Sequence, residues 1–135
     1  MTDNDLPLVD GYYPTIGIEC HVQLKTKTKL FAGVDNDARS ADPNTLISHI
    51  CLGMPGALPV LNEKAIELAS RAAFALNTVP SKFSKFDRKH YFYPDLPNGY
   101  QITQFDEPIV IGGHVDITVQ GKKKTVGVTR AHLEA

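Results

Sequence analysis

The stretch Pro14-Thr-Ile-Gly-Ile-Glu-Cys-His-Val-Gln-Leu-Lys25 alternates apolar and polar side chains, which predicts a β-strand with one face on a core. Its polar face carries Glu19 and His21, two residues apart and therefore separated by about 6.6 Å. A carboxylate and an imidazole at this spacing can reach one divalent cation or one proton. The alternative is a solvated polar face, which most half-buried antiparallel strands carry. The predicted core face consists of Ile16, Ile18, Cys20, Val22 and Leu24.

Composition limits the class of protein to which this strand can belong. The 135 residues, 42% of them hydrophobic, suit one ordinary domain. Fourteen basic and fifteen acidic residues leave a net charge of -1, so any contact with RNA must be local. The two cysteines fit a reducing compartment, and no apolar run approaches the length of a membrane span. We therefore predict a cytoplasmic protein, with residues 1–10 as a disordered tail.

The rest of the pattern predicts an α+β fold. Residues 25–59 are rich in turn-forming residues, and a loop of this length is a candidate wall of a site. Residues 63–76 have the spacing of a helix, with Asn62 placed to cap its first turn and Asn77 followed by Pro80 to end it. The predicted buried stripe of this helix is Ala65, Leu68, Ala69, Ala72 and Leu76.

Residues 82–105 combine aromatic, basic and turn-forming side chains. Such a mixture can hold phosphate and stack a base, as proteins do at single-stranded RNA ends. The alternative is that the rings pack a loop onto the core, and composition alone favours neither. The central members of this cluster are Arg88, Lys89, His90, Tyr91, Phe92 and Tyr93.

The carboxyl end predicts a β-hairpin with arms over residues 114–120 and 125–134, and with the lysine run 122–124 in its solvated turn. One face of the second arm passes from valines to ionisable side chains. If this arm lies beside the first strand, two carboxylates and two imidazoles converge on one hard cation, with Arg130 available for a phosphate. The alternative is a bulge that turns these residues into solvent. The converging residues would be Glu19, His21, His132 and Glu134.

Four blocks of the sequence resemble the signature blocks of the B subunit of the aspartyl/glutamyl-tRNA(Asn/Gln) amidotransferases. They occur in the family's order and span residues 11–134, which correspond to the beginning of a longer family protein. The blocks are Ile16-Gly-Ile-Glu-Cys-His-Val-Gln-Leu24, Cys51-Leu-Gly-Met-Pro-Gly-Ala-Leu-Pro-Val-Leu-Asn62, Phe86-Asp-Arg-Lys-His-Tyr-Phe-Tyr-Pro-Asp-Leu-Pro-Asn-Gly-Tyr-Gln-Ile-Thr-Gln104 and Arg130-Ala-His-Leu-Glu134.

The resemblance implies a reaction and a set of partners. In this family, the B subunit joins an A subunit, which is an amidase, and a small C subunit. It uses ATP and magnesium to phosphorylate the side-chain carboxylate of a misacylated tRNA(Gln) or tRNA(Asn), and ammonia from the amidase subunit then displaces the phosphate. The resemblance also implies that residues 11–135 form the N-terminal portion of a cradle-shaped, glutamine-synthetase-like domain, an antiparallel or mixed sheet with a packed helix.

The matching motifs assign expected roles to residues. Glu19, His21 and Glu134 are the expected catalytic residues and magnesium ligands, because they match the family's Glu-x-His and His-Leu-Glu motifs. Phosphoryl transfer to a carboxylate brings negative oxygens together, and a bound magnesium ion neutralises their charge. The residues expected to bind the acylated tRNA end are Arg88, Lys89, His90, Tyr91, Tyr93, Tyr100 and Gln101.

The chain departs from the family pattern at two places. Many members carry a four-cysteine zinc site, and a single thiol at those positions predicts no structural zinc here. Ala135 stands where the family usually has a second acidic residue, so we expect a truncated chain that is inactive alone. Two other functions stay open, a non-catalytic RNA-binding module and a small metal-dependent hydrolase. The four positions of the family's zinc ligands are Ala32, Val34, Ser48 and Cys51.

Overall fold

The computed structural model describes residues 8–135, and most of the predicted disordered tail, residues 1–7, lies outside the described residues. Three two-stranded antiparallel sheets, β1–β2, β3–β6 and β4–β5, accompany one helix within residues 8–135, which confirms the α+β class. No parallel pair contributes to these sheets, so the mixed-sheet alternative is wrong for this part of the chain. The elements are α1 (Glu63–Ala75), β1 (Asp87–His90), β2 (Tyr100–Thr103), β3 (Val110–Ile111), β4 (His114–Val119), β5 (Lys122–Gly127) and β6 (Arg130–Ala131).

The helix α1 forms where the sequence predicts it. Asn62 caps it, since its side-chain oxygen accepts a hydrogen bond from the Lys64 backbone N–H at 3.0 Å. Asn77, just past the carboxyl end, has a φ of 57°, the left-handed conformation that commonly ends helices. One position of the predicted stripe is wrong, because Ala72 is exposed and the next residue is buried instead. The fully buried positions are Ala65, Ala69 and Ala73.

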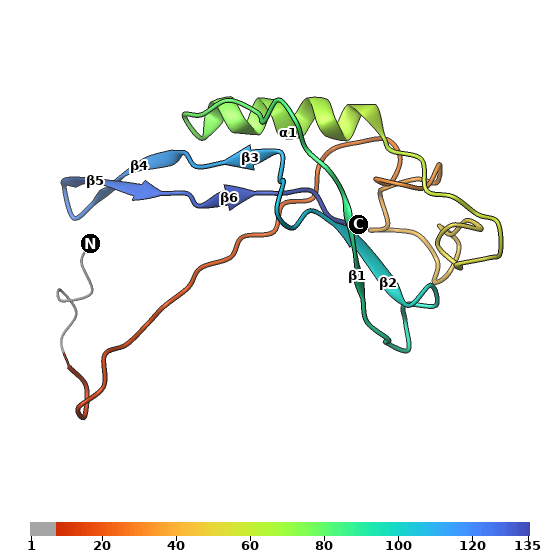
Figure 1. Cartoon of the computed structure of the whole chain (residues 1–135), viewed down its shortest axis with the longest axis horizontal. Coiled ribbons are helices and arrows are strands. Elements are labelled where there is room, and N and C mark those ends of the chain that lie inside the picture. The colour runs from red at the N-terminus through yellow and green to blue at the C-terminus, as the bar shows by residue number, and fades with distance from the viewer. Residues whose placement is uncertain (1–7) are drawn as a thin grey trace.

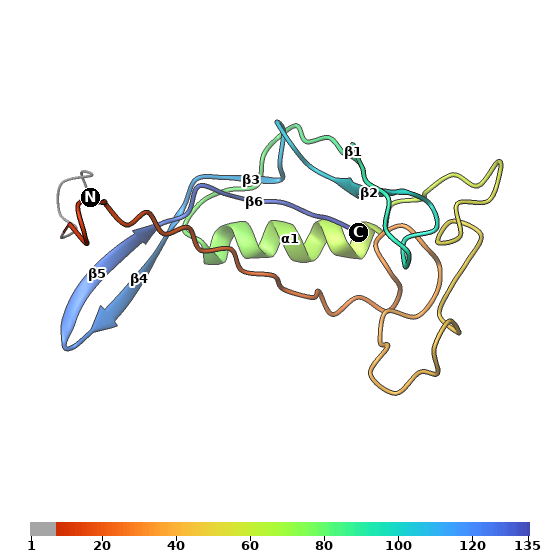
Figure 2. The ribbon, with the colours of Figure 1, turned by 90° about the horizontal axis from the view of Figure 1, so that it is seen from below.

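The core lies between α1 and the β3–β6 pair. Figure 1 shows α1 lying along these two short strands, and Figure 2 shows the same layers from below. The small alanine side chains on the inner face of α1 let the helix lie close to the strands. The core cluster is Ala69, Ala73, Ile109, Val110 and Leu133, and the hydrophobic residues packed against it are Leu24, Leu30, Ile66, Leu76, Phe86 and Ala131.

The carboxyl-terminal hairpin is present with different bounds from those predicted. β4 pairs with β5 around a turn at Gln120 and Gly121, both with positive φ, as hairpin turns require. The lysine run 122–124 is therefore part of β5 and not of the turn. The predicted second arm divides, because β6 leaves β4 and pairs with β3. The β4–β5 hairpin projects beyond one end of α1, and β1–β2 lies at the other end (Figure 1).

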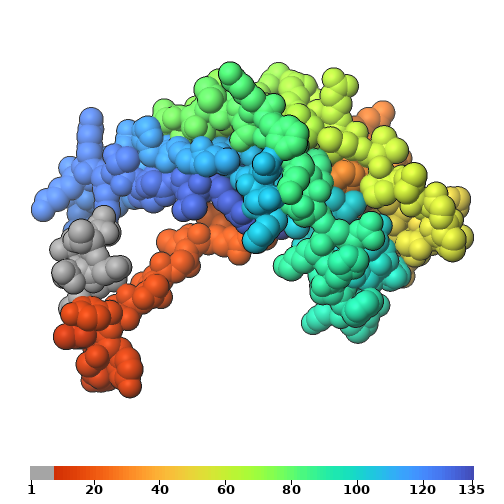
Figure 3. All heavy atoms as spheres, viewed as in Figure 1, coloured from red at the N-terminus to blue at the C-terminus, as the bar shows by residue number. Residues whose placement is uncertain are grey.

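The predicted strand over residues 14–25 is wrong, because this segment is extended but pairs with no strand among the described residues. Its predicted core face is largely in solvent, with Ile18 88% exposed and Cys20 exposed as well. Only Leu24, at the end of the segment, packs against the core cluster. Figure 3 shows the segment projecting from the body in orange to red. An alternating pattern needs a partner strand and a covering layer to form a buried strand, and neither is present in the described part of the chain.

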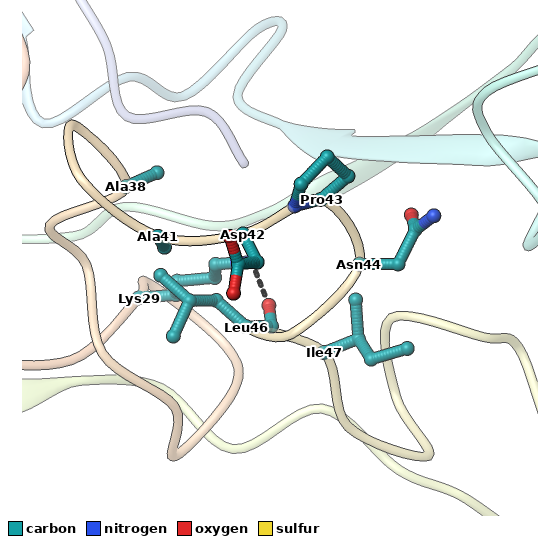
Figure 4. Close-up of a pocket in the computed structure, with 8 residues that line it drawn as sticks. All are labelled: Lys29, Ala38, Ala41, Asp42, Pro43, Asn44, Leu46 and Ile47. Carbon is teal, nitrogen blue, oxygen red and sulfur yellow. Dashed lines mark hydrogen bonds between the residues drawn. The ribbon is translucent and has the colours of Figure 1, made fainter.

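The passage over residues 25–59 is a loop, as predicted, apart from an isolated bridge between Thr28 and Asp35. The loop folds around Lys29, whose ammonium group donates to the Leu46 carbonyl at 2.6 Å at the edge of a surface pocket (Figure 4). None of the predicted site residues lines this pocket. Within residues 8–135, no helix has the length and hydrophobicity required to cross a bilayer.

Candidate functional site

Four ionisable side chains from the two ends of the chain meet in one row. His21 Nε2 lies 3.5 Å from Glu19 Oε1, and His21 Nδ1 lies 3.2 Å from Glu134 Oε1. His132 Nε2 lies 3.4 Å from the other oxygen of Glu134, Oε2. The prediction that the two segments come together is therefore confirmed, although the first segment is not a strand and the four side chains form a row of pairs. We call these four residues the acidic–histidine cluster.

The His132 and Glu134 side of the cluster is anchored in the body of the protein. Leu133, between these two residues, is buried in the core, and its backbone N–H donates to the side-chain oxygen of Gln104 at 3.0 Å. The Ala135 N–H donates to the Ile102 carbonyl of β2 at 2.9 Å. The segment after β6 is thus fixed by one buried side chain and by backbone bonding to β2.

The Glu19 and His21 side is held much more loosely. About 75% of the Glu19 side chain and 69% of the His21 side chain are exposed. The nearest anchor lies a few residues further on, where the Asn36 side chain donates to the Leu24 carbonyl at 2.9 Å and the Gln23 side chain donates to the Asn36 carbonyl at 3.0 Å. These contacts fix the end of the segment and leave its polar side chains accessible.

The arrangement of charges in the cluster suits a proton or a cation. A neutral imidazole has one N–H, so His21 donates to only one of its two carboxylate neighbours unless the ring is protonated. No three His, Cys, Asp or Glu side chains in the described residues form a ready metal cage. Magnesium needs no such cage, because it is commonly held by one or two carboxylates with waters and phosphates. Glu19 and Glu134 fit that mode of binding.

Sequence analysis left Arg130 available for a phosphate, and the structure shows it in a hydrogen bond. Its guanidinium group donates to the carbonyl oxygen of Phe105, which ties β6 to the residues after β2. The side chain therefore stiffens the approach to the cluster from β6. The recorded bond uses one of the five guanidinium N–H donors, so the others remain able to bind a phosphate.

The predicted tRNA-binding residues lie mainly on the β1–β2 hairpin, which sequence analysis did not predict as a hairpin. Arg88 lies 4.9 Å above the ring of Tyr100, a cation–π contact across the strands, and His90 packs edge-on against the same ring at 6.4 Å between centroids. Lys89 lies 5.8 Å from the centre of the Tyr91 ring. The basic residues of β1 are thus followed directly by aromatic residues, and the two kinds of side chain contact each other.

The aromatic rings at the tip of this hairpin are not used for packing. Phe92 is 89% exposed and Tyr93 is 65% exposed, so the alternative that these rings pack the loop onto the core is wrong for them. The Gly53 backbone approaches Asn98, in the loop after β1, so closely that a side chain at position 53 would collide with it. The glycine, with a φ of 63°, lets the second and third signature blocks touch.

The β1–β2 hairpin and the acidic–histidine cluster come together at Ala135. Gln101, one of the predicted tRNA-binding residues, donates from its side chain to the Ala135 carbonyl at 2.8 Å. Glu134 precedes Ala135, so the last carboxylate of the cluster is one residue from the hairpin contact. Residues predicted for two roles, activation and tRNA binding, thus occupy one continuous region.

Sequence analysis missed Gln104, the most deeply buried polar residue of the described chain, at 1% exposure. It follows β2 and contacts the backbone at both Ile109 and Leu133. The residues before Gln104 are half-buried, and no pattern in the sequence marks the glutamine as the buried one. Only its burial identifies it as a structural centre of the site.

Two of the four positions that the resemblance aligns with zinc ligands, Ser48 and Cys51, form a small polar contact. The Cys51 thiol lies 3.5 Å from the Ser48 hydroxyl. Burial alone raises the pKa of the Cys51 thiol, but hydrogen bonds from Ser48 and the charge of Lys29 outweigh it, so the pKa lies below its ordinary value. Ala32 is buried, and Val34 is half-buried. Cys51 is the only thiol of this set, fewer than a structural zinc site requires.

Comparison with known proteins places these features in a family. The model of the GatB/GatE catalytic domain matches residues 14–135. Among curated proteins, the B subunit of the aspartyl/glutamyl-tRNA(Asn/Gln) amidotransferase of Geotalea uraniireducens is 54% identical over 91% of this chain and 26% of its own length. The protein of the same name from Oceanobacillus iheyensis is 55% identical over 88% of the chain and 25% of its own length.

A third relative of that name, from Nitratidesulfovibrio vulgaris, is 51% identical over 92% of the chain and 26% of its own length. The chain thus spans about a quarter of the length of the curated relatives that it matches. The family match covers the extended segment, the helix, the β1–β2 hairpin and the residues of the acidic–histidine cluster. The chain belongs to the GatB/GatE catalytic domain family.

Proposed function

We propose that this chain supplies the acidic–histidine cluster of an ATP-dependent activation centre in a tRNA amidotransferase. The observation that carries the proposal is the meeting of Glu19, His21 and Glu134 within 3.2 to 3.5 Å, from two signature blocks at opposite ends of the chain. The family relationship supports the same role, because the relatives are named as the B subunit of such enzymes. Residues 11–135 would form part of a cradle-shaped, glutamine-synthetase-like domain.

The proposed reaction has two steps. A side-chain carboxylate oxygen of Glu-tRNA(Gln) or Asp-tRNA(Asn) attacks the γ-phosphorus of ATP, and ADP leaves. Ammonia then attacks the acyl phosphate carbon, phosphate leaves, and the amide forms. The first step brings two sets of negative oxygens together, so it needs positive charge at the centre.

Magnesium would supply that charge when it is bound by Glu19 and Glu134, whose oxygen donors suit a hard cation. His21 lies between the two carboxylates, and its ring orients both of them when both ring nitrogens carry a proton. His132 contacts the second oxygen of Glu134 and restricts its rotation. The exposure of Glu19 and His21 leaves room for a nucleotide and a substrate carboxylate to approach.

The β1–β2 hairpin would bind the acylated end of the tRNA. Its exposed rings offer stacking surfaces for unpaired bases, and Arg88 and Lys89 offer charge for phosphates. The hydrogen bond between Gln101 and Ala135 joins this surface to the residue after Glu134. A tRNA end bound on the hairpin would therefore reach the activation centre.

The test of the activation role is the substitution of the two carboxylates. Glu19→Gln or Glu134→Gln in the complete enzyme, assembled with the amidase and the small third subunit and supplied with misacylated tRNA, should lower tRNA-dependent ADP formation at least about 100-fold, or about 3 kcal/mol in barrier. The matched control is Glu63→Gln, an exposed carboxylate of α1 outside the cluster, which should keep the rate. Unchanged ADP formation in both cluster variants would refute the proposal.

The tRNA-binding role has its own measurement. Arg88→Ala and Tyr91→Ala should each raise the apparent KM for aminoacyl-tRNA by about tenfold while leaving the KM for ATP within twofold, since single stacking or phosphate contacts are worth about 1–3 kcal/mol. Lys123→Ala, an exposed lysine of β5, is the control for simple loss of charge. Equal effects of Arg88→Ala and Lys123→Ala would mean that only overall charge matters, and an unchanged KM for aminoacyl-tRNA in Tyr91→Ala would contradict stacking on that ring.

The 135-residue chain by itself should form no amidated tRNA, because the proposed ammonia source lies in a different subunit. Incubation with ATP, magnesium, glutamine and misacylated tRNA measures this directly. Amidation by the chain alone would show that it needs no partner.

A further inference from the structure

The Gln104 side chain uses its complete hydrogen-bonding capacity. Its oxygen accepts from the backbone N–H groups of Ile109 at 3.2 Å and Leu133 at 3.0 Å. Its nitrogen donates to the Ser84 hydroxyl and, at 3.2 Å, to the Lys85 carbonyl. A primary amide has two donors and two acceptor positions, so no capacity is left for a ligand. Gln104 therefore acts on the protein itself.

Gln104 also supplies a hydrogen-bond acceptor at the point where the β3–β6 ladder ends. Val110 faces Ala131 in this antiparallel pair, so continuing the register by two residues would place Pro108 opposite Leu133. Pro108 has no N–H to donate to the Leu133 carbonyl, and its own carbonyl already accepts from the Ser81 hydroxyl at 2.9 Å. The Gln104 oxygen receives the Leu133 N–H instead, and it holds the neighbouring Ile109 N–H at the same point.

The hydrogen bond from Leu133 to Gln104 affects the acidic–histidine cluster because of its position in the chain. Leu133 lies between His132 and Glu134, whose side chains contact each other at 3.4 Å. Rotation of the backbone at Leu133 would turn both neighbours away from their present directions. Among the described residues after β6, Ala135 also donates its backbone N–H, to the Ile102 carbonyl. Ala135 lies on the other side of Glu134 from Leu133. Glu134 is therefore held between two fixed N–H groups.

We propose that Gln104 is a positioning residue that directs Glu134 toward His21, an inference that rests on the proposed function for its catalytic part. Gln104 touches neither carboxylate of the cluster and acts through the Leu133 backbone. A residue that only stabilised the fold would change the unfolding temperature and leave the geometry of Glu134 intact. The two roles are therefore separable.

The experiment compares Gln104→Met, which removes all four hydrogen bonds of the Gln104 side chain, with Ser84→Ala, which removes one of them on the nitrogen side together with the bond from Ser84 to the Glu107 carbonyl. NMR of the full chain should show a cross-peak between the His21 ring protons and the Glu134 γ-protons, whose groups are 3.2 Å apart at their nearest heavy atoms. We expect Gln104→Met to lose this cross-peak and Ser84→Ala to keep it. Gln104→Glu retains acceptor oxygen and should restore it.

In the complete enzyme, Gln104→Met should lower kcat at least tenfold and change the KM for ATP less than twofold. Added to Glu134→Gln, it should lower kcat no further, because a residue that acts through Glu134 has no effect without it. A retained cross-peak with a normal kcat and a lowered unfolding temperature would overturn the proposal. If the unsubstituted enzyme forms no amidated tRNA, the proposed function fails, and the cross-peak still decides the placement of Glu134.

A second pair of variants covers the case in which Gln104→Met does not fold. Replacing the Leu133 amide by an ester deletes only the N–H that Gln104 accepts, and the same replacement at Ile109 deletes the other. The Leu133 ester should lose the cross-peak, and the Ile109 ester should keep it. Identical spectra for the two esters would refute the positioning role.

Discussion

The segment with His132 and Glu134 and the segment with Glu19 and His21 form one cluster, but the protein holds them in different ways. The first follows a paired strand and has the buried Leu133 at its centre. The second is extended, unpaired among the described residues, and exposed on both faces. The same kind of side chain is therefore fixed on one side and adjustable on the other. The contact of His21 with Glu134 joins the two segments within the cluster.

For the proposed activation centre, this difference suits a site that must admit a large substrate. A fixed carboxylate can define where a cation sits, while an accessible carboxylate and imidazole can close on it after the nucleotide has entered. Ion pairs between exposed groups contribute little to stability. Movement of Glu19 and His21 should therefore change the free energy of unfolding very little. The comparison predicts unequal effects of substitutions in the two segments.

The largest expected difference is between Leu133→Ala and Ile18→Ala. Leu133 is 8% exposed within the core cluster, so its truncation should lower the free energy of unfolding by about 2–5 kcal/mol. Ile18 is 88% exposed, and its truncation should change stability by less than about 0.5 kcal/mol. Urea unfolding of the two variants measures the difference. Equal losses would show that the extended segment is packed in solution.

A smaller effect is expected at the connection between the two regions. The Asn62 side chain caps α1 and also donates to the Thr28 carbonyl at 3.0 Å, which ties the loop after the extended segment to the helix. Asn62→Ala should cost about 1–2 kcal/mol by urea unfolding. Asn62→Asp keeps the cap and loses the donor, so it should recover about half. A full loss in the aspartate variant would assign the stability to the loop contact.

The smallest effect is expected from the ion pairs on the surface of α1. A hydrogen bond from Lys64 is the main cause that holds the pKa of the Glu67 carboxyl below its ordinary value of 4.5, with Arg71 also contributing. A lowered folded pKa stabilises the protein above the unfolded pKa, and this stability is lost as the pH falls below about 4.5 through the folded value. NMR titration of Glu67 should show this shift, and Lys64→Met should reduce it. An ordinary titration in the unsubstituted chain would contradict the pairing.

Local patterns were the successful part of the sequence analysis. The helix was predicted within one residue at its end, because capping by Asn62 and the spacing of its alanines are properties of a short stretch. The β4–β5 hairpin was predicted near its true position, because the Gln120-Gly121 turn and the flanking strands are also local. The lysine run was predicted in the turn because of its charge, but charge does not determine where a turn begins.

The strand over residues 14–25 failed for the opposite reason. Its alternation is a local pattern, but pairing and burial depend on distant segments, and the described structure provides neither. Cys20 was assigned to the core on the same pattern and is exposed. The predicted cluster survived this error, since the contact of His21 with Glu134 needs proximity and not a ladder.

The sequence by itself determined the helix, the hairpin turn, the residue types of the acidic–histidine cluster and the resemblance to the amidotransferase family, because each is written in contiguous residues. The tertiary structure alone decided that β6 leaves the hairpin to pair with β3, that the rings of residues 92 and 93 stay exposed, and that Gln104 is buried at the end of the ladder. These outcomes depend on which distant backbone groups compete for the same hydrogen bonds and the same small core. Such competition is a property of the folded chain and not of any one of its segments.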